Sequence, residues 1–320
     1  PEFGGDPKAF RSAELRGNEV VAAGRLAVFV VAGGQGTRLG FAGPKGEFPV
    51  GPISDRSLFE IQAQKIRGLA RRFGRRIPWY VMTSDATDAA TRRLFADKHC
   101  FGLPPEDVFL FSQEMVPAFD FEGRLLLEAP DRIFESPGGH GGALTALASS
   151  GALSDMETRG IDRIFYYQVD NPLVRMGDPI YVGFHEQARA EMSCKVMRKL
   201  DPLEKVGVVV RRDGRPGIVE YTELDSELRY ARDASGRLLH WAGNIAIHLL
   251  NRDFVARIAK GADQLLPYHV SPKPIPTIDA SGRPVVPQQP NGYKLERFVF
   301  DALPEAAGVC VLEVRAAEEF

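Results

Sequence analysis

A buried strand that runs straight into a glycine-rich loop constrains this chain more than any other feature. Residues 26–32 read LAVFVVA, an apolar run typical of a strand covered on both faces of a parallel sheet. The loop that follows, residues 33–46, reads GGQGTRLGFAGPKG. Its glycines allow the backbone to approach a ligand closely and to direct N–H groups at an anion. Arg38 and Lys45 add donors suited to phosphate oxygens, so the loop predicts a phosphate-binding site.

The spacing of this loop excludes two common nucleotide-binding motifs. The P-loop pattern G-x-x-x-x-G-K-[ST] is absent. The dinucleotide pattern G-x-G-x-x-G fails at Leu39, and no acidic residue follows a second strand at the required distance. A plain glycine turn is the remaining alternative, but it would leave Arg38 and Lys45 without a role.

The wider pattern alternates strands with helices and then changes. Strands are expected at 26–32, 77–83, 108–111 and 163–169, and helices at 57–73, 85–98 and 142–150. Later strand-like segments with short connections, at 195–198, 207–211, 218–222 and 241–248, predict an antiparallel extension of the sheet. Residues 267–290 are proline-rich and are expected to be irregular. The pattern predicts an α/β fold with a central, mostly parallel mixed sheet and helices on both faces, with ligands beyond the strands' carboxyl ends.

Composition narrows the class of protein. The 320 residues carry a net charge of −2, so no basic field predicts binding to nucleic acid or a membrane surface. No apolar run reaches the roughly 18 residues of a membrane span. Cys100, Cys194 and Cys310 are far apart and lack metal-ligand spacing. An odd number of cysteines without a signal peptide favours a reducing, cytoplasmic location.

The glycine loop resembles the G-G-x-G-T-R-L-G…P-K-G signature of the UDP-N-acetylhexosamine pyrophosphorylase family, uridylyltransferases that make UDP-sugars. Further blocks follow in that family's order and cover most of the chain: IPWYVMTS (77–84), Gln113, PGGHGG (137–142), YYQVDNPLV (166–174), VGVVVRRDGRPGIVEYTE (206–223), WAGNIAIH (241–248) and PNGYKLERFVFD (290–301). The resemblance implies a Rossmann-like nucleotide-diphospho-sugar transferase fold. It also implies a reaction in which UTP and a sugar 1-phosphate give a UDP-sugar and pyrophosphate.

The same resemblance assigns roles to residues that composition alone leaves unremarkable. It places Mg²⁺ (or Mn²⁺) on Asp170, although composition alone would favour a role in capping the turn before Pro172. The implied catalytic residues, which neutralise phosphate charge, are Arg38, Lys45 and Lys294. The implied uridine-binding residues are Val31, Ala32, Gly33, Gly34, Gln113 and Gly139. The implied sugar-binding residues are His140, Gly207, Glu220 and Asn244.

Two departures from the family pattern shape the expectations. N-acetylhexosamine enzymes carry Asn where this chain has His140, and His is more typical of UDP-glucose and broad UDP-sugar pyrophosphorylases. The surrounding blocks still favour UDP-N-acetylglucosamine or UDP-N-acetylgalactosamine as the product. The alternative is a UDP-glucose or broad UDP-sugar pyrophosphorylase, and a non-catalytic UDP-sugar-binding protein is an alternative of another kind. The family also has a phosphate-binding lysine beyond the position of Phe320. We expect a lead-in segment at 1–25, a nucleotidyltransferase catalytic domain at 26–270, and at 271–320 a proline-rich connection that opens a truncated C-terminal region.

Overall fold

A mixed central sheet organises the molecule. The computed structural model describes residues 5–320, apart from the side chain of Arg38. The path of the sheet runs β12-β11-β13-β9-β1-β2-β3, and β10 and β18 continue it from β13. Its strands are β1 (Leu26–Val31), β2 (Trp79–Thr83), β3 (Val108–Ser112), β9 (Arg163–Gln168), β10 (Met192–Arg198), β11 (Val208–Arg212), β12 (Arg215–Val219), β13 (Ala242–Asn251) and β18 (Val309–Val314).

The sheet is parallel on one side and mixed on the other, as the sequence pattern predicts. β9, β1, β2 and β3 run parallel to one another. β13 is antiparallel to β9, β10 and β11, while β18 is parallel to β10. The carboxyl ends of the parallel strands therefore share one edge, where ligands bind in such sheets.

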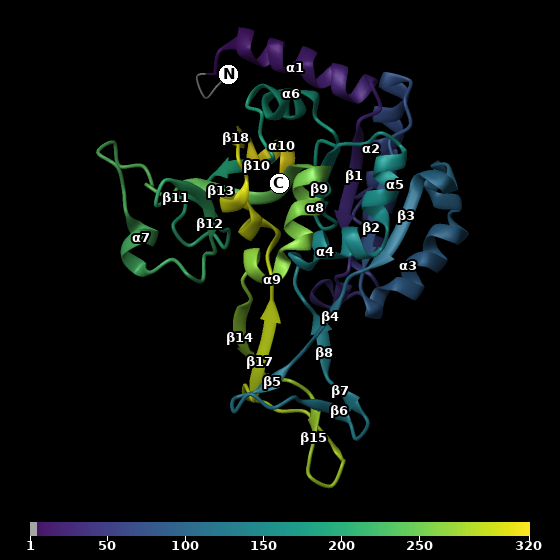
Figure 1. The fold of residues 1–320 in the computed structure, drawn as a ribbon, viewed down its shortest axis with the longest axis vertical. Coiled ribbons are helices and arrows are strands. Elements are labelled where there is room, and N and C mark those ends of the chain that lie inside the picture. Colours follow the sequence, from purple (N-terminus) through teal and green to yellow (C-terminus); the bar gives the residue numbers. More distant parts are fainter. Residues whose placement is uncertain (1–4) are drawn as a thin grey trace.

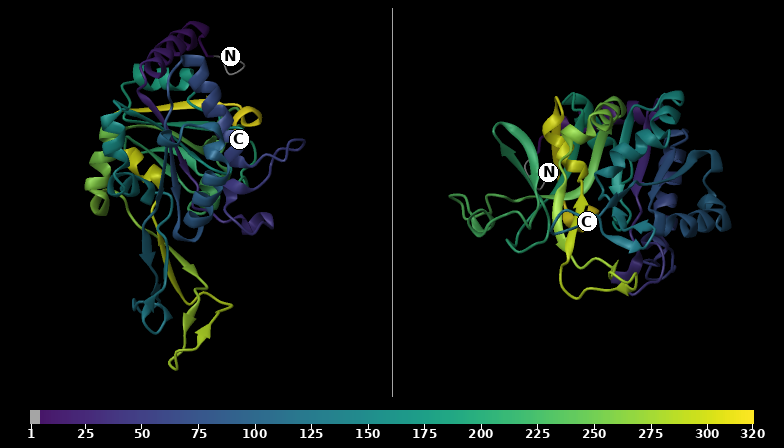
Figure 2. Two further views of the ribbon diagram at one scale, coloured as in Figure 1. Left: turned by 90° about the vertical axis from the view of Figure 1, so that its right-hand side faces the viewer. Right: turned by 60° about the horizontal axis from the view of Figure 1, so that its bottom comes forward.

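Helices cover both faces of the sheet, because alternate residues of a strand point to opposite sides. Val28 and Val30 of β1 belong to one hydrophobic core, and Ala27 and Phe29 belong to the other. The two layers are visible in the left view of Figure 2. The first core contains residues of α1 (Pro7–Ala22), α2 (Leu58–Phe73), α3 (Asp85–Asp97) and α6 (Pro179–Gln187). The second contains residues of α4 (Gly142–Ser149), α5 (Ala152–Thr158) and α8 (Arg252–Lys260).

Polar side chains fix where the first helices begin. Ser57 and Glu60 form a reciprocal capping box at the start of α2, at 3.2 and 2.9 Å. At the start of α3, the Ser84 backbone N–H donates to Thr87 Oγ1 at 3.1 Å. The Ser84 hydroxyl donates to the carbonyl of Gly33 at 2.8 Å. The start of α3 is therefore tied to the glycine loop that follows β1.

The expectation of irregular structure at 267–290 is wrong, because this segment contributes strands to an arm that extends from the sheet (Figure 1). β14 (His269–Lys273) pairs with β17 (Gly292–Glu296), which pairs in turn with β5 (Phe119–Asp120). Pro272 fits β14 because an edge strand leaves one side free of ladder bonds. The other small strands are β4 (Met115–Pro117), β6 (Leu127–Ala129), β7 (Arg132–Ile133), β8 (Glu135–Pro137), β15 (Thr277–Ile278) and β16 (Pro284–Val285).

Short elements complete the fold. β12 ends at Val219, earlier than the predicted 218–222 strand, because Glu220 begins a turn in which its carbonyl accepts from the backbone N–H groups of Glu223 and Leu224. The remaining elements are η1 (Gly36–Leu39), η2 (Lys45–Glu47), η3 (His99–Gly102), η4 (Pro105–Asp107), α7 (Ser226–Tyr230), α9 (Ala262–Leu265), η5 (Val299–Glu305) and α10 (Ala316–Glu319).

Candidate active site

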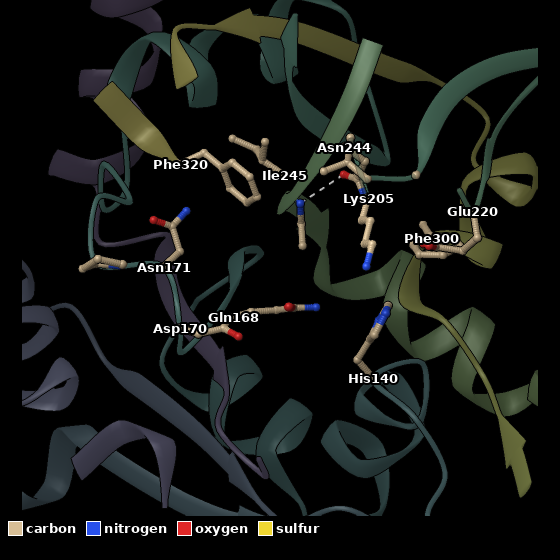
Figure 3. Close-up of a pocket in the computed structure, with 14 residues that line it drawn as sticks. His140, Gln168, Asp170, Asn171, Lys205, Glu220, Asn244, Ile245, Phe300 and Phe320 are labelled. Carbon is tan, nitrogen blue, oxygen red and sulfur yellow. Dashed lines mark hydrogen bonds between the residues drawn. The ribbon is translucent and has the colours of Figure 1, made fainter. Parts of the chain in front are cut away.

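A cavity of about 480 Å³ opens beyond the carboxyl end of β9, and residues just before β11 and in the first half of β13 form another side of it. Figure 3 shows the side chains that surround it. They come from segments up to 180 residues apart, from His140 to Phe320. The lining residues are His140, Gln168, Asp170, Asn171, Pro172, Lys205, Val206, Gly207, Glu220, Asn244, Ile245, Ala246, Phe300 and Phe320.

All four predicted sugar-binding residues line this cavity. Three of them form one wall: the Asn244 backbone N–H donates to the Gly207 carbonyl at 2.8 Å. A Cβ atom on Gly207 would lie 3.0 Å from Glu220 Oε1, so any larger residue there would crowd the carboxylate. This wall presents a carboxylate and an amide, groups that can bind sugar hydroxyls.

The fourth residue, His140, is held in one protonation state. The Val299 backbone N–H donates to His140 Nδ1 at 3.2 Å, so the neutral ring carries its proton on Nε2. The ring stacks on Phe298 at 5.0 Å between centroids and lies 5.5 Å from Phe300. Burial lowers the pKa of His140 from 6.5 to about 4. His140 therefore stays neutral near pH 7 and offers a single N–H donor.

The pKa of the Glu220 carboxyl is shifted upward, whereas that of His140 is shifted downward. Burial, together with the nearby charge of Glu223, raises the pKa of the Glu220 carboxyl above its usual value. His269 acts against this rise and lowers the pKa of Glu220. Its Nδ1 lies 3.2 Å from Glu223 Oε1, and its Nε2 lies 3.0 Å from Asp301 Oδ2, both within hydrogen-bond distance. The cavity wall therefore holds a carboxylate that accepts a proton more readily than an exposed one.

The glycine loop at 33–46 reaches the edge of the same cavity through an ion pair. Lys45 Nζ lies 3.0 Å from Asp170 Oδ2. Asp170 lies just after β9, and Lys45 begins η2 in the loop that follows β1, the parallel neighbour of β9. Their side chains are 24% and 47% exposed, so solvent and ligands can reach the pair. The predicted phosphate and metal residues are therefore neighbours, 125 positions apart in sequence.

Close packing around Gly33 leaves little room for a side chain there. A Cβ on Gly33 would lie 2.7 Å from Gln113 Nε2 and 3.2 Å from Ser84 Cβ. Two predicted uridine-binding residues, Gly33 and Gln113, are thus brought together. The carbonyl of Gly34 accepts from the Lys45 backbone N–H at 2.9 Å, which folds the loop back on itself. Val31 and Ala32, at the end of β1, lead directly into this contact.

The second glycine loop is bound to the backbone at the end of β17. Gly139 has a φ of +76°, a conformation that favours glycine. A Cβ there would lie 2.5 Å from the Arg297 carbonyl oxygen. The Arg297 backbone N–H donates to Gly138 at 2.8 Å, and its carbonyl accepts from Gly141 at 2.7 Å. These bonds set the position of the intervening His140.

Of the three predicted catalytic residues, Lys45 stands at the cavity edge beside Asp170 without lining the cavity, and the other two are not placed there. Lys294 lies on β17 in the arm, with its ammonium 5.2 Å from the centre of the Phe134 ring, and it is absent from the lining. Burial lowers the pKa of Lys294. The side chain of Arg38 lies outside the part of the chain that the structure describes, although its backbone belongs to η1.

The residues that could hold a divalent ion are few. Among the described residues, no group of three or more His, Cys, Asp or Glu side chains is arranged to bind a metal. Mg²⁺ commonly uses one or two carboxylates and completes its shell with water and substrate phosphate. The half-exposed Asp170 carboxylate, at the edge of the cavity, fits that kind of site.

Sequence reasoning missed several lining residues. Lys205, directly before the VGVV block, extends into the cavity between Gln168 and His140 in Figure 3. Ala246 lies in an irregularity of β13, where Val196 pairs with Asn244 but Cys194 pairs with His248.

Ala246 has a positive φ of 55°, and its backbone N–H donates to Asn244 Oδ1 at 3.2 Å. The irregularity thus orients Asn244, and no local sequence signal reveals it.

None of the helices in the described part of the chain is both long and apolar enough to cross a membrane.

Comparison with known families and structures agrees with the geometry. Human UDP-N-acetylhexosamine pyrophosphorylase-like protein 1 is 40% identical over 321 residues, which cover 98% of this chain and 63% of the human protein. The UDP-N-acetylglucosamine pyrophosphorylase of Saccharomyces cerevisiae is 39% identical over 312 residues, covering 95% and 65%. This chain thus spans less than two thirds of the length of these curated relatives.

The fold is shared as well. The uridine diphosphate N-acetylglucosamine pyrophosphorylase of Trypanosoma brucei, solved in complex with an inhibitor, superimposes with a TM-score of 0.87 at 33% identity. The match covers 98% of this chain and 64% of that one. The nucleotidyltransferase fold expected from the sequence is therefore confirmed. The model of the family described as UTP–glucose-1-phosphate uridylyltransferase matches residues 8–316, and the chain belongs to that family.

Proposed function

We propose that the protein is a uridylyltransferase that converts UTP and a sugar 1-phosphate into a UDP-sugar and pyrophosphate. One observation carries the proposal: the Lys45–Asp170 pair stands at the edge of the same cavity that contains His140, Gly207, Glu220 and Asn244. A phosphate-binding lysine at the edge of a cavity that is lined by hydroxyl-binding groups is what a nucleotide-sugar site requires. The printed names of the relatives favour N-acetylglucosamine 1-phosphate as the sugar substrate.

The proposed reaction needs positioning and charge neutralisation, with no covalent enzyme intermediate. A phosphate oxygen of the sugar 1-phosphate attacks the α-phosphorus of UTP in line. The bond between that phosphorus and the oxygen leading to the β-phosphate breaks, and pyrophosphate leaves. Gly33 and Gln113 would bind the uracil edge, and the Lys45 ammonium would neutralise phosphate charge.

The remaining roles follow from where the charges lie. Asp170 would hold Mg²⁺ or Mn²⁺, which when bound would neutralise phosphate oxygens. Lys205 extends into the cavity, so we propose that it contacts the sugar phosphate. The family resemblance implies the same role for Lys294 and a phosphate-binding role for Arg38, and both remain predictions.

The compartment and partners are also proposals. Cys100, Cys194 and Cys310 are free thiols, which supports a reducing location such as the cytoplasm. UTP, the sugar 1-phosphate and the UDP-sugar are the expected small-molecule partners.

A product assay tests the function. The purified protein should be incubated with UTP, Mg²⁺ and N-acetylglucosamine 1-phosphate, and both UDP-sugar and pyrophosphate should be quantified. Equal amounts of the two products, lost in Lys45→Met, are expected. Glucose 1-phosphate and N-acetylgalactosamine 1-phosphate in parallel would define the sugar. Binding of UDP-sugar without pyrophosphate release would instead favour a non-catalytic binding protein, and absence of both would overturn the proposal.

A further inference from the structure

A second cavity, of about 430 Å³, lies beyond the end of β10 and shares no lining residue with the candidate active site. It is formed where the chain leaves β10 and where the loop after α7 returns to β13, in the segment that projects beside β11 and β12 in Figure 1. Its lining residues are Arg198, Lys199, Leu200, Arg232, Asp233, Gly236, Arg237, Leu238 and Trp241.

Lys199 is the unusual residue of this cavity. Its residue surface is only 3% exposed, yet none of the described side chains forms a hydrogen bond or ion pair with its ammonium group. Burial lowers the pKa of Lys199, and this outweighs the attraction of Glu204 and Asp201. The Lys199 ammonium is not one of the fully enclosed unpaired atoms, so it opens onto the cavity, where a bound anion would compensate its charge.

The surrounding charges also favour an anion. Four of the lining side chains are basic and one, Asp233, is acidic. Arg237 forms an ion pair with Asp233 at 3.3 Å. Arg198 forms an ion pair at 2.9 Å with Glu313, a residue that does not line the cavity. Arg232 donates to the carbonyl of Gly236 at 2.8 Å, which fixes one nitrogen of its guanidinium and leaves further donors.

Apolar groups line the remaining wall of the cavity. The Arg198 guanidinium lies 5.1 Å from the centre of the Trp241 ring, and Leu238 is buried. A ligand whose anionic group binds Lys199 could therefore pack its organic part against this apolar wall. The volume is within the range of small-molecule sites.

We propose that this second cavity binds a small phosphorylated metabolite, with its phosphate at Lys199 and its organic part between Trp241 and Leu238. Arg232 supplies further donors to the phosphate. The proposal does not depend on the reaction at the first cavity.

Phosphate binding can be measured through Trp241, because the chain has only one other tryptophan, Trp79, which is fully buried in the core. The probes are inorganic phosphate and glucose 6-phosphate, titrated at constant ionic strength. The titration is carried out in a Lys45→Met background, which weakens phosphate binding at the first cavity. We expect a saturable fluorescence change, with glucose 6-phosphate binding more tightly than phosphate.

Three variants in the same background decide the outcome. Lys199→Met should weaken binding at least tenfold, and Lys199→Arg should retain most of it. The matched control Lys8→Met, an exposed lysine on α1, should bind as the background does. Circular dichroism checks that each variant is folded, and Arg232→Gln offers an independent test with a severalfold loss. No saturable change in the background protein, or undiminished binding in Lys199→Met, would overturn the proposal.

Discussion

Lys45 Nζ and Asp170 Oδ2 lie 3.0 Å apart, although 125 positions separate the two residues in sequence. Both side chains are partly exposed, and exposed ion pairs typically contribute about 0–1 kcal/mol to stability. The pair therefore contributes little to stability, although it stands at the edge of a cavity. We propose that in the complex with substrate the Lys45 ammonium binds phosphate and the Asp170 carboxylate binds the metal, so that the two no longer pair with each other.

The first prediction separates this role from a structural one. Lys45→Met should reduce turnover by about 10²–10³-fold, the usual cost of removing one preorganised charge from a transition state. Asp170→Asn should slow turnover and raise the magnesium concentration needed for half-maximal rate. Neither change should lower the free energy of unfolding by more than about 1 kcal/mol. Normal turnover and normal magnesium dependence in Asp170→Asn would show that the Asp170 carboxylate caps the turn and does not hold the metal.

The second prediction concerns Lys205, which extends into the cavity. Lys205→Met should raise KM for the sugar 1-phosphate about 10-fold or more, since a hydrogen bond to a charged group contributes about 1.5–3 kcal/mol. KM for UTP should change less. A comparable rise in KM for both substrates would show that Lys205 attracts anionic substrates in general and does not contact the sugar phosphate specifically. Lys205→Arg, which keeps the charge, is the control.

The third prediction concerns sugar choice. The ring of His140 offers one N–H donor, because Nδ1 already accepts from Val299. An Asn amide can both donate to and accept from an acetamido group. His140→Asn should therefore shift the ratio of kcat/KM values for N-acetylglucosamine 1-phosphate and glucose 1-phosphate toward the acetylated sugar, by roughly 10–200-fold. An unchanged ratio would mean that residue 140 does not contact the sugar.

The fourth prediction uses a buried charge cluster near the cavity. Lys195 is fully buried and pairs with Glu319 at 2.7 Å and Asp178 at 2.8 Å. Glu319→Gln leaves the ammonium with one carboxylate and should lower the free energy of unfolding by about 3 kcal/mol.

A neighbouring residue provides the matched control for this change. Glu318 forms an exposed pair with Arg175, so Glu318→Gln should change stability by less than about 1 kcal/mol. Urea titration of both variants gives the comparison. Equal, small losses would show that the buried pair adds nothing beyond what an exposed one does. The backbone carbonyl of Glu319 also accepts from Asn171 at 2.6 Å, so KM values should be recorded with stability.

The fifth prediction is a dependence of stability on pH. Burial lowers the pKa of His185 to about 4 and that of His248 to about 3, from 6.5. The unfolded chain takes up these protons below pH 6.5 while the folded chain does not. Stability should therefore be fully present above pH 6.5 and decrease as the pH falls toward 4.

Each of these histidines contributes up to about 1.4 kcal/mol per pH unit within that window. Both ring nitrogens of His248 lack a hydrogen-bond partner among the described residues, so His248→Phe removes its titration at little cost in hydrogen bonds. Free energies of unfolding measured from pH 7 to 5 should fall less steeply in His248→Phe than in wild type. Parallel profiles would show that His248 does not contribute.

Local sequence patterns were sufficient to predict the parallel half of the fold. The apolar run at 26–32, the helical periodicity at 57–73 and the glycine loop each depend on residues close together in sequence, so this strand, helix and turn can be recognised directly. The resemblance to one family then identified which residues converge on a ligand, and the cavity contains five of them: His140, Asp170, Gly207, Glu220 and Asn244.

The tertiary structure decided what depends on contacts between distant segments. Residues 267–290 look irregular by composition, but β14 forms because β17 offers it a partner. Lys205 directly precedes one recognisable block and Lys294 lies within another, yet only Lys205 lines the cavity. Lys199 carries no local signal at all, because its burial without a partner depends on where the loop after α7 packs. Periodicity describes how a segment meets the core, whereas the neighbours of a polar side chain depend on how segments far apart in sequence pack together.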